Sequence, residues 1–140
     1  MLVRLLYASR ARDPITNETI ASILSQSRKN NPETGVTGVL CVCHGGVFIQ
    51  VLEGGRDEVN RLYNKVLHDN RHVDVTLLEY AEIAERRFSG WRMGRVDLDK
   101  VNTAVVLKYS EKPQLDPFGM SGAVARKLLE ELASSASIVG

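Results

Sequence analysis

The chain has 140 residues, of which 44% are hydrophobic, and its 18 basic and 17 acidic side chains leave a formal charge of +1. This length suffices for one well-buried core and argues against a multidomain enzyme. The balanced charge lacks the basic face that binding to a phosphate backbone requires, so no nucleic-acid partner is expected.

The N-terminal segment resembles a strand rather than a signal peptide, and no apolar run approaches the roughly 20 residues of a membrane span. We therefore expect a cytoplasmic protein without membrane contact. Cys41 and Cys43 are too few for a disulfide framework and are expected to be reduced thiols in or near the core. With His44 they offer three zinc ligands where a structural site takes four, so no metal site is predicted.

The hydrophobic periodicity predicts seven regular elements before residue 98. They are a strand over 2–8, a helix over about 16–30, strands over 36–43 and 47–53, a helix over 56–69, and strands over 75–83 and 91–97. This order predicts an α+β fold, a ferredoxin-like βαββαββ sandwich with a C-terminal helical extension. We expect one domain over 1–97 and the extension over 98–140.

The extension has its own pattern. Residues 99–109 look helical, Pro113 and Pro117 break the chain, and a last amphipathic helix carries an apolar stripe of Val124, Leu128, Leu129 and Leu132. The strand over 47–53 is apolar on both faces, whereas helices cover only one face of a ferredoxin-like sheet. We expect the extension or another chain to cover the second face, and the extension to contribute to a homo-oligomeric or partner contact.

Five polar or unusual side chains stand where the local pattern asks for apolar core. They are Tyr7, Asn31, Gln50, Trp91 and Met93. Gln50 shares a strand face with Phe48 and Leu52, and burying its amide without partners costs about 1–3 kcal/mol. A helical stripe through Ile23 turns polar at Ser27 and Asn31, and Trp91 and Met93 share one face of a predicted strand. Together these side chains predict the lining of a ligand site.

Signals for catalysis are weak. The pairs Gly45-Gly46 and Gly54-Gly55 are expected turn glycines rather than parts of a nucleotide fingerprint, and no motif frames a serine nucleophile. Four acids are expected to be solvated charges at helix ends and strand edges, namely Asp69, Asp74, Glu79 and Glu82.

The enzymatic alternative is a small ferredoxin-like enzyme, either an acylphosphatase-like hydrolase or a cofactor-free oxygenase. A hydrolase of that kind needs a phosphate-cradling loop near the first strand, and Ser9-Arg10-Ala11-Arg12 lacks the expected glycines.

Five separated motifs, in order and spacing, resemble the BLUF family of blue-light sensors that bind FAD. They are Tyr7-Ala8-Ser9, Asn30-Asn31 with Gly35-Val36-Thr37-Gly38-Val39-Leu40, Phe48-Ile49-Gln50-Val51-Leu52-Glu53-Gly54, Asp69-Asn70-Arg71-His72, and Arg86-Arg87-Phe88 with Gly90-Trp91-Arg92-Met93. The resemblance runs from residue 2 to about 97. The tail through Leu107-Lys108-Tyr109-Ser110 is similar to that of the short stand-alone, PixD-type members.

The resemblance implies an isoalloxazine ring held between the two helices and against the sheet. Asn31 would bind the N3/C4=O edge, Gln50 would reach N5 and O4, Tyr7 would hydrogen-bond Gln50, and Arg71 would serve the O2 side. The other cofactor-binding residues implied are Ile23 and Val66 on the two ring faces, Ser27, Phe48, Leu52, His72 and Met93. Asn30 stands where some members carry a histidine, so no site role is assigned to it.

The resemblance also implies a mechanism without enzymatic activity. Tyr7 would donate an electron and a proton through Gln50, whose amide then rearranges by rotation or tautomerisation and shifts the flavin absorption to the red. Met93, or Trp91 in another strand register, would contact that amide, and which of them faces the flavin in the dark stays open. The output would be a changed contact with a downstream effector, a response regulator or a signalling enzyme, in a dimer or a larger homo-oligomer.

Overall fold

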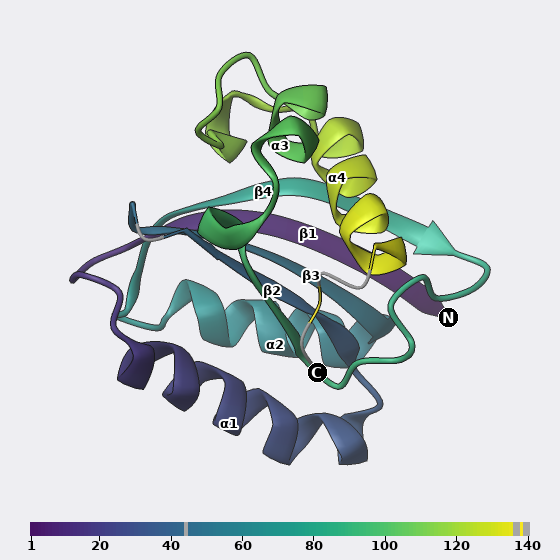
Figure 1. Cartoon of the computed structure of the whole chain (residues 1–140). Helices are drawn as coiled ribbons and strands as arrows, with labels where there is room; N and C mark the ends of the chain where they lie inside the picture. The colour runs from purple at the N-terminus through teal and green to yellow at the C-terminus, as the bar shows by residue number, and fades with distance from the viewer. Residues whose placement is uncertain (44, 136–137, 139–140) are drawn as a thin grey trace.

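The computed structural model describes residues 1–43, 45–135 and 138, and for residues 30–32 it describes the backbone alone. Its helices and strands are β1 (Leu2–Ala11), α1 (Asn17–Thr34), β2 (Thr37–Cys43), β3 (Val47–Gly55), α2 (Arg56–Leu67), β4 (His72–Ile83), β5 (Gly94–Asp97), α3 (Thr103–Tyr109) and α4 (Gly122–Ser134). Figure 1 shows three layers, with α1 and α2 on one face of the sheet and α3 and α4 on the other.

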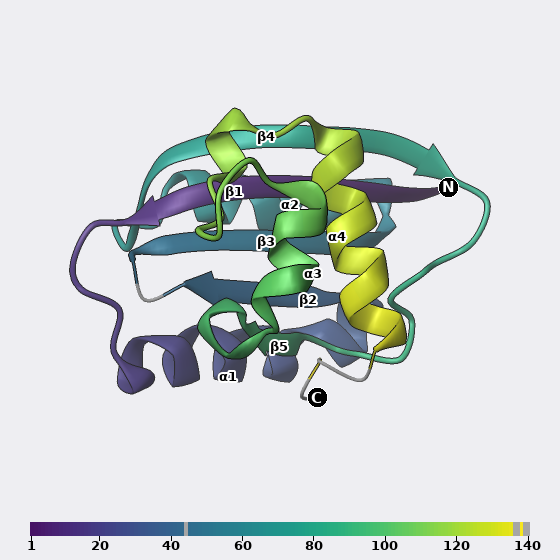
Figure 2. The ribbon, with the colours of Figure 1, turned by 45° about the horizontal axis from the view of Figure 1, so that its top comes forward.

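The sheet has the strand order β4-β1-β3-β2-β5, and the strands lie side by side in the view of Figure 2. Neighbouring strands are antiparallel except for the edge pair β2 and β5, which is parallel. The α+β, ferredoxin-like prediction is confirmed, with β5 added beside β2. The register places Tyr7 opposite Gln50, so their side chains project from adjacent strands to the same face.

Three strands are longer than predicted, β3 by two residues at its C-terminal end and β1 and β4 by three residues each. β1 extends to Ala11 and β4 begins at His72, because these two residues pair with each other between the adjacent antiparallel strands. Register shifts interrupt the β1–β4 pairing between Leu6 and Tyr7 and between Ala8 and Arg10. Such irregularities break the strict alternation of apolar and polar residues, so the pattern understated both strands.

The predicted strand over 91–97 is wrong in its first half. The strand β5 begins at Gly94, and Trp91 and Met93 lie in the irregular segment before it. Because strand alternation does not apply there, the two side chains point to opposite faces of the sheet: Met93 joins the core beneath α1 and α2, and Trp91 packs against the core beneath α4. The indole of Trp91 lies over Gly94, where an added Cβ would come within 3.1 Å of the ring.

The second face of the sheet carries its own apolar core. Leu128, Leu129 and Leu132 of α4 are buried there together with Ile49 and Val51 of β3. The first turn of α4 approaches β4 so closely that a Cβ on Gly122 would lie 2.1 Å from the carbonyl oxygen of Leu78. The helix expected over 99–109 is a one-turn 3-10 helix, Leu98–Lys100, followed by α3.

The cysteines lie on this second face. Cys41 is buried in the core, and burial raises the pKa of the half-buried Cys43 to about 12, so both remain thiols. His44, the third candidate zinc ligand, lies outside the described residues. Among the residues that are described, no three His, Cys, Asp or Glu side chains cluster in a way that could hold a metal ion. Within the same part of the chain, every helix is too short or too polar to cross a membrane.

Candidate functional site

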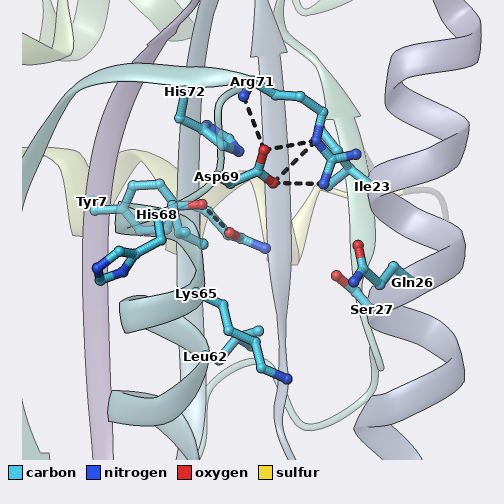
Figure 3. Close-up of a pocket in the computed structure, with 12 residues that line it drawn as sticks. Tyr7, Ile23, Gln26, Ser27, Leu62, Lys65, His68, Asp69, Arg71 and His72 are labelled. Carbon is cyan, nitrogen blue, oxygen red and sulfur yellow. Dashed lines mark hydrogen bonds and ion pairs between the residues drawn. The ribbon is translucent and has the colours of Figure 1, made fainter.

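A cavity of about 390 Å³ lies between α1, α2 and the face of the sheet that these two helices cover. This volume falls in the range of about 300–1,000 Å³ that is usual for small-molecule sites. Figure 3 shows the lining side chains, which come from both helices, from the segment after α2, and from the strands. They are Tyr7, Ile23, Gln26, Ser27, Gln50, Leu62, Lys65, Val66, His68, Asp69, Arg71 and His72.

The helical periodicity of α1 and α2 builds the two side walls. Ile23 and Ser27 are one turn apart on α1, and Leu62 and Val66 are one turn apart on α2, so each pair shares a face of its helix. Each of the four side chains lines the cavity. The walls are therefore apolar over Ile23, Leu62 and Val66 and become polar at Ser27.

The floor of the cavity carries a buried chain of three side chains centred on Gln50. The phenol Oη of Tyr7 donates to Gln50 Oε1, and Gln50 Nε2 donates to Met93 Sδ over 3.2 Å. Tyr7 is 1% exposed and Gln50 4% exposed, so this is a satisfied polar pair inside a core. Burial raises the pKa of the Tyr7 phenol, with smaller contributions from Tyr63 and Asp69, so the hydroxyl stays protonated.

The imidazole of His72 forms another wall of the cavity, and a buried hydrogen bond holds it in place. Its Nδ1 lies 2.8 Å from the hydroxyl of Ser9, which has no exposed surface. The imidazole also packs against aromatic rings, with centroid distances of 5.1 Å to Phe48 and 6.4 Å to Tyr7. Burial lowers the pKa of His72, so the ring is held neutral and fixed in orientation beside the tyrosine.

Arg71 and Asp69 form an ion pair at one end of the cavity, away from Leu62 and Lys65 in Figure 3. The guanidinium donates to Asp69 Oδ2 from Nε over 3.0 Å and from Nη2 over 2.6 Å, and Nη1 reaches Ser22 of α1 over 3.3 Å. This hydrogen bonding lowers the pKa of Asp69. The interpretation of Asp69 as a solvated charge is therefore wrong: it orients an arginine that bridges to α1.

The structure brings together most of the side chains predicted for the site. Seven of them line the cavity: Tyr7, Ile23, Ser27, Gln50, Val66, Arg71 and His72. Met93 contacts Gln50, whereas Phe48 and Leu52 lie in the core and outside the lining. Trp91 packs against the opposite core, contrary to the predicted shared face. The side chain of Asn31 lies outside the described residues.

Five lining residues were not predicted: Gln26, Leu62, Lys65, His68 and Asp69. Leu62 lies on the same apolar stripe as Val66, and that stripe was the signal available for it. Gln26 and Lys65 each precede a predicted lining residue in the sequence, at the rim of a helix face. A polar side chain at that rim has the same local pattern as one that faces solvent, so periodicity alone does not identify it.

The fold and the cavity define a small α+β protein with a ligand site between two helices and a sheet. A model of the BLUF family, described as sensors of blue-light using FAD, matches residues 2–94. The chain therefore belongs to this family of flavin-binding blue-light sensors.

Two solved structures are similar over nearly the whole length of both chains. The photo-activated state of BlsA has a TM-score of 0.83 at 30% identity and covers 95% of each chain. The dark-state structure of BlrB, named as a BLUF protein, has a TM-score of 0.81 at 30% identity and covers 96% of each chain.

Curated relatives are longer proteins. The photoactivated adenylate cyclase subunit beta of Euglena gracilis is 34% identical over 93 residues, which are 66% of this chain and 11% of the relative. The blue light- and temperature-regulated antirepressor BluF of Escherichia coli K12 is 33% identical over 120 residues, which are 82% of this chain and 30% of the relative. The chain thus spans about a tenth of the first relative and under a third of the second.

Proposed function

We propose that this blue-light sensor binds FAD noncovalently in the cavity between α1 and α2 and switches by rearranging the amide of Gln50. The observation that carries the proposal is the position of that amide, held between the Tyr7 hydroxyl and the Met93 thioether at the cavity floor. We further propose that the chain is not itself an enzyme, and that it signals from the cytoplasm by a changed contact with an effector protein.

The residues present suit a flavin. Ile23 and Val66 offer apolar surface from the two helices, and Gln50 offers both a donor and an acceptor from the sheet. The edge of an isoalloxazine alternates donors and acceptors in the same way, and we propose Asn31 as a second amide partner. Arg71 has five N–H donors, more than Asp69 and Ser22 take up, and suits a carbonyl oxygen on the other side of the ring.

A bound flavin supplies the absorption of blue light and, once excited, a strong oxidising power. The contribution of the chain begins at Tyr7, whose buried phenol keeps its proton and directs it at Gln50 Oε1. Tyr7 is therefore the proposed donor of the electron and the proton. The electron would go to the excited flavin, and the proton would pass to Gln50 Oε1, which already accepts the hydrogen bond from Tyr7. Rearrangement of the Gln50 amide is the proposed switch.

The two orientations of the Gln50 amide differ in energy because of its neighbours. In the observed orientation the carbonyl accepts from Tyr7 and the NH2 group donates to Met93. After rotation the NH2 group would donate to the phenol oxygen, which can accept, but the carbonyl would face a thioether, which has no proton to donate. The site thus favours one orientation and leaves the other accessible, as a two-state switch requires.

The proposed output uses the second face of the sheet. Met93 and Trp91 lie two residues apart, one in each core, so a movement of this segment at Gln50 reaches the core beneath α4 directly. We propose that α3 and α4 carry the change to a homo-oligomeric or effector contact. The names of the cyclase and antirepressor relatives, which join light to a regulated activity, support an effector such as a response regulator or a signalling enzyme.

The test compares two glutamines that line the same cavity. Gln50→Leu should keep bound FAD and lose the light-induced red shift, because leucine fills the volume but exchanges no hydrogen bonds. Gln26→Leu, on the exposed rim of α1, is the matched control and should keep the shift. A reversible red shift of normal size in Gln50→Leu would refute the switch. Folded wild-type protein that binds neither FAD nor FMN would refute the cofactor proposal.

A further inference from the structure

Glu53 is a fully buried carboxylate on the side of the sheet opposite the cavity. It lies three positions beyond Gln50 in β3, and strand alternation puts it on the face of Val51, toward α4. None of its surface is exposed. A buried charge is costly unless it is paired and hydrogen-bonded, so its partners show what the side chain holds in place.

The partners of Glu53 are backbone amides of the segment that leads to Met93. The N–H of Arg87 donates to both carboxylate oxygens, over 3.0 and 3.1 Å, and the N–H of Phe88 donates to Oε1 over 2.7 Å. Hydrogen bonds to a carboxylate are about twice as strong as neutral ones. Glu53 therefore anchors the backbone five residues before the thioether that contacts Gln50.

The same carboxylate is connected to α4 through ion pairs. Arg4 Nη1 lies 3.4 Å from Glu53, and Arg4 Nε lies 3.4 Å from Glu79. Glu79 in turn pairs with Arg126 of α4 over 3.0 Å. Glu79, predicted as a solvated charge, is thus a partly buried bridge between the sheet and α4, and that prediction is wrong.

We propose that Glu53 is a positioning residue that couples the Gln50 switch to α4. This inference rests on the proposed function. When light rearranges the Gln50 amide, its contact with Met93 changes, and the segment carrying Met93 must shift. The backbone of Arg87 and Phe88 is hydrogen-bonded to Glu53, so this shift displaces the Glu53 carboxylate. The ion pairs through Arg4, Glu79 and Arg126 then transmit the displacement to α4.

The experiment measures backbone hydrogen exchange in the dark and under blue light in full-length, FAD-bound protein. The variant Glu53→Gln keeps the shape but presents an NH2 group to backbone donors. It should keep the red shift, exchange the amides of residues 87 and 88 about tenfold faster or more in the dark, since bonds to a charged group are lost, and lose the light-minus-dark difference over residues 122–134.

Two matched variants separate coupling from stability. Glu79→Gln should keep slow exchange at residues 87 and 88 but weaken the light response of α4, because only the second half of the network is cut. Glu58→Gln, which changes a partly exposed carboxylate paired with Arg61 on α2, should alter neither the exchange at residues 87 and 88 nor the light response of α4. If Glu53→Gln does not fold, Glu53→Asp takes its place, because it keeps the charge and withdraws the carboxylate by one methylene group.

A merely structural Glu53 would lower the free energy of unfolding and leave the light-minus-dark difference of α4 intact. That result, or wild-type exchange at residues 87 and 88 in the Glu53 variant, would overturn the inference. A wild-type protein without a red shift would instead refute the proposed function. In that event the dark exchange of residues 87 and 88 still decides whether Glu53 anchors the segment.

Discussion

The Tyr7–Gln50 hydrogen bond predicts a strong energetic coupling between these two residues. Tyr7→Phe leaves the buried Gln50 carbonyl without the partner it has in this structure, and Gln50→Leu does the same to the Tyr7 hydroxyl. Each single change should lower the free energy of unfolding by about 1–3 kcal/mol, the cost of an unsatisfied buried polar group. The double variant removes both polar groups, so its free energy of unfolding should fall by less than the sum of the decreases in the two single variants.

The coupling is measured by urea unfolding of the four proteins in the dark at fixed, saturating FAD. The dissociation constant of each variant is measured separately, so that stabilisation by bound ligand can be subtracted. The expected coupling energy is about 1–3 kcal/mol, within the range for residues in direct contact. A control cycle of Tyr63→Phe with Gln26→Leu, for which no shared hydrogen bond is found, should be additive. Additivity of the Tyr7 and Gln50 changes within about 0.5 kcal/mol would refute the buried pair.

Three further predictions follow from the same geometry. Met93→Leu should keep FAD and the red shift but slow the dark recovery, because without the thioether acceptor the two amide orientations become closer in energy; an unchanged recovery rate would count against this role. Burial lowers the pKa of His72, so as the pH falls below about 6.5 the unfolded chain takes up a proton before the folded chain does, and stability is lost there. The urea midpoint should decrease more between pH 7 and pH 5.5 in the wild type than in His72→Asn, and equal decreases would contradict the buried neutral ring. Deletion of residues 98–140 should expose the core beneath α4 and cause aggregation or altered assembly while the red shift survives; a soluble truncated protein with the oligomeric state of the full chain would contradict the covering role.

The parts of the fold that follow regular periodicity could be predicted from the sequence. Alternation along β1 and β3 put Tyr7 and Gln50 on apolar faces, and antiparallel pairing then brought them together. The helix stripes through Ile23 and Val66 gave two walls of the cavity in the same way. An amide on an apolar strand face strongly indicates a site with hydrogen-bond partners, because burying an amide requires such partners.

The irregular segments could not be predicted in the same way. Trp91 and Met93 precede β5, so strand alternation assigned them to one face although they point to opposite faces. The acids Asp69 and Glu79 looked solvated because their partners, Arg71 and the pair Arg4 and Arg126, are set by turn geometry and tertiary packing. Sequence spacing does not contain that information. The same holds for Glu53, whose partners are backbone amides of a segment 34 residues further along the chain.

The most direct test of the central claim is the absorption spectrum of purified, FAD-reconstituted protein before and after blue light. We expect a yellow protein whose flavin bands shift slightly to the red on illumination and return in the dark, with the shift absent in Tyr7→Phe. Folded protein that binds flavin and shows the same spectrum before and after illumination would contradict the proposed Tyr7–Gln50 switch.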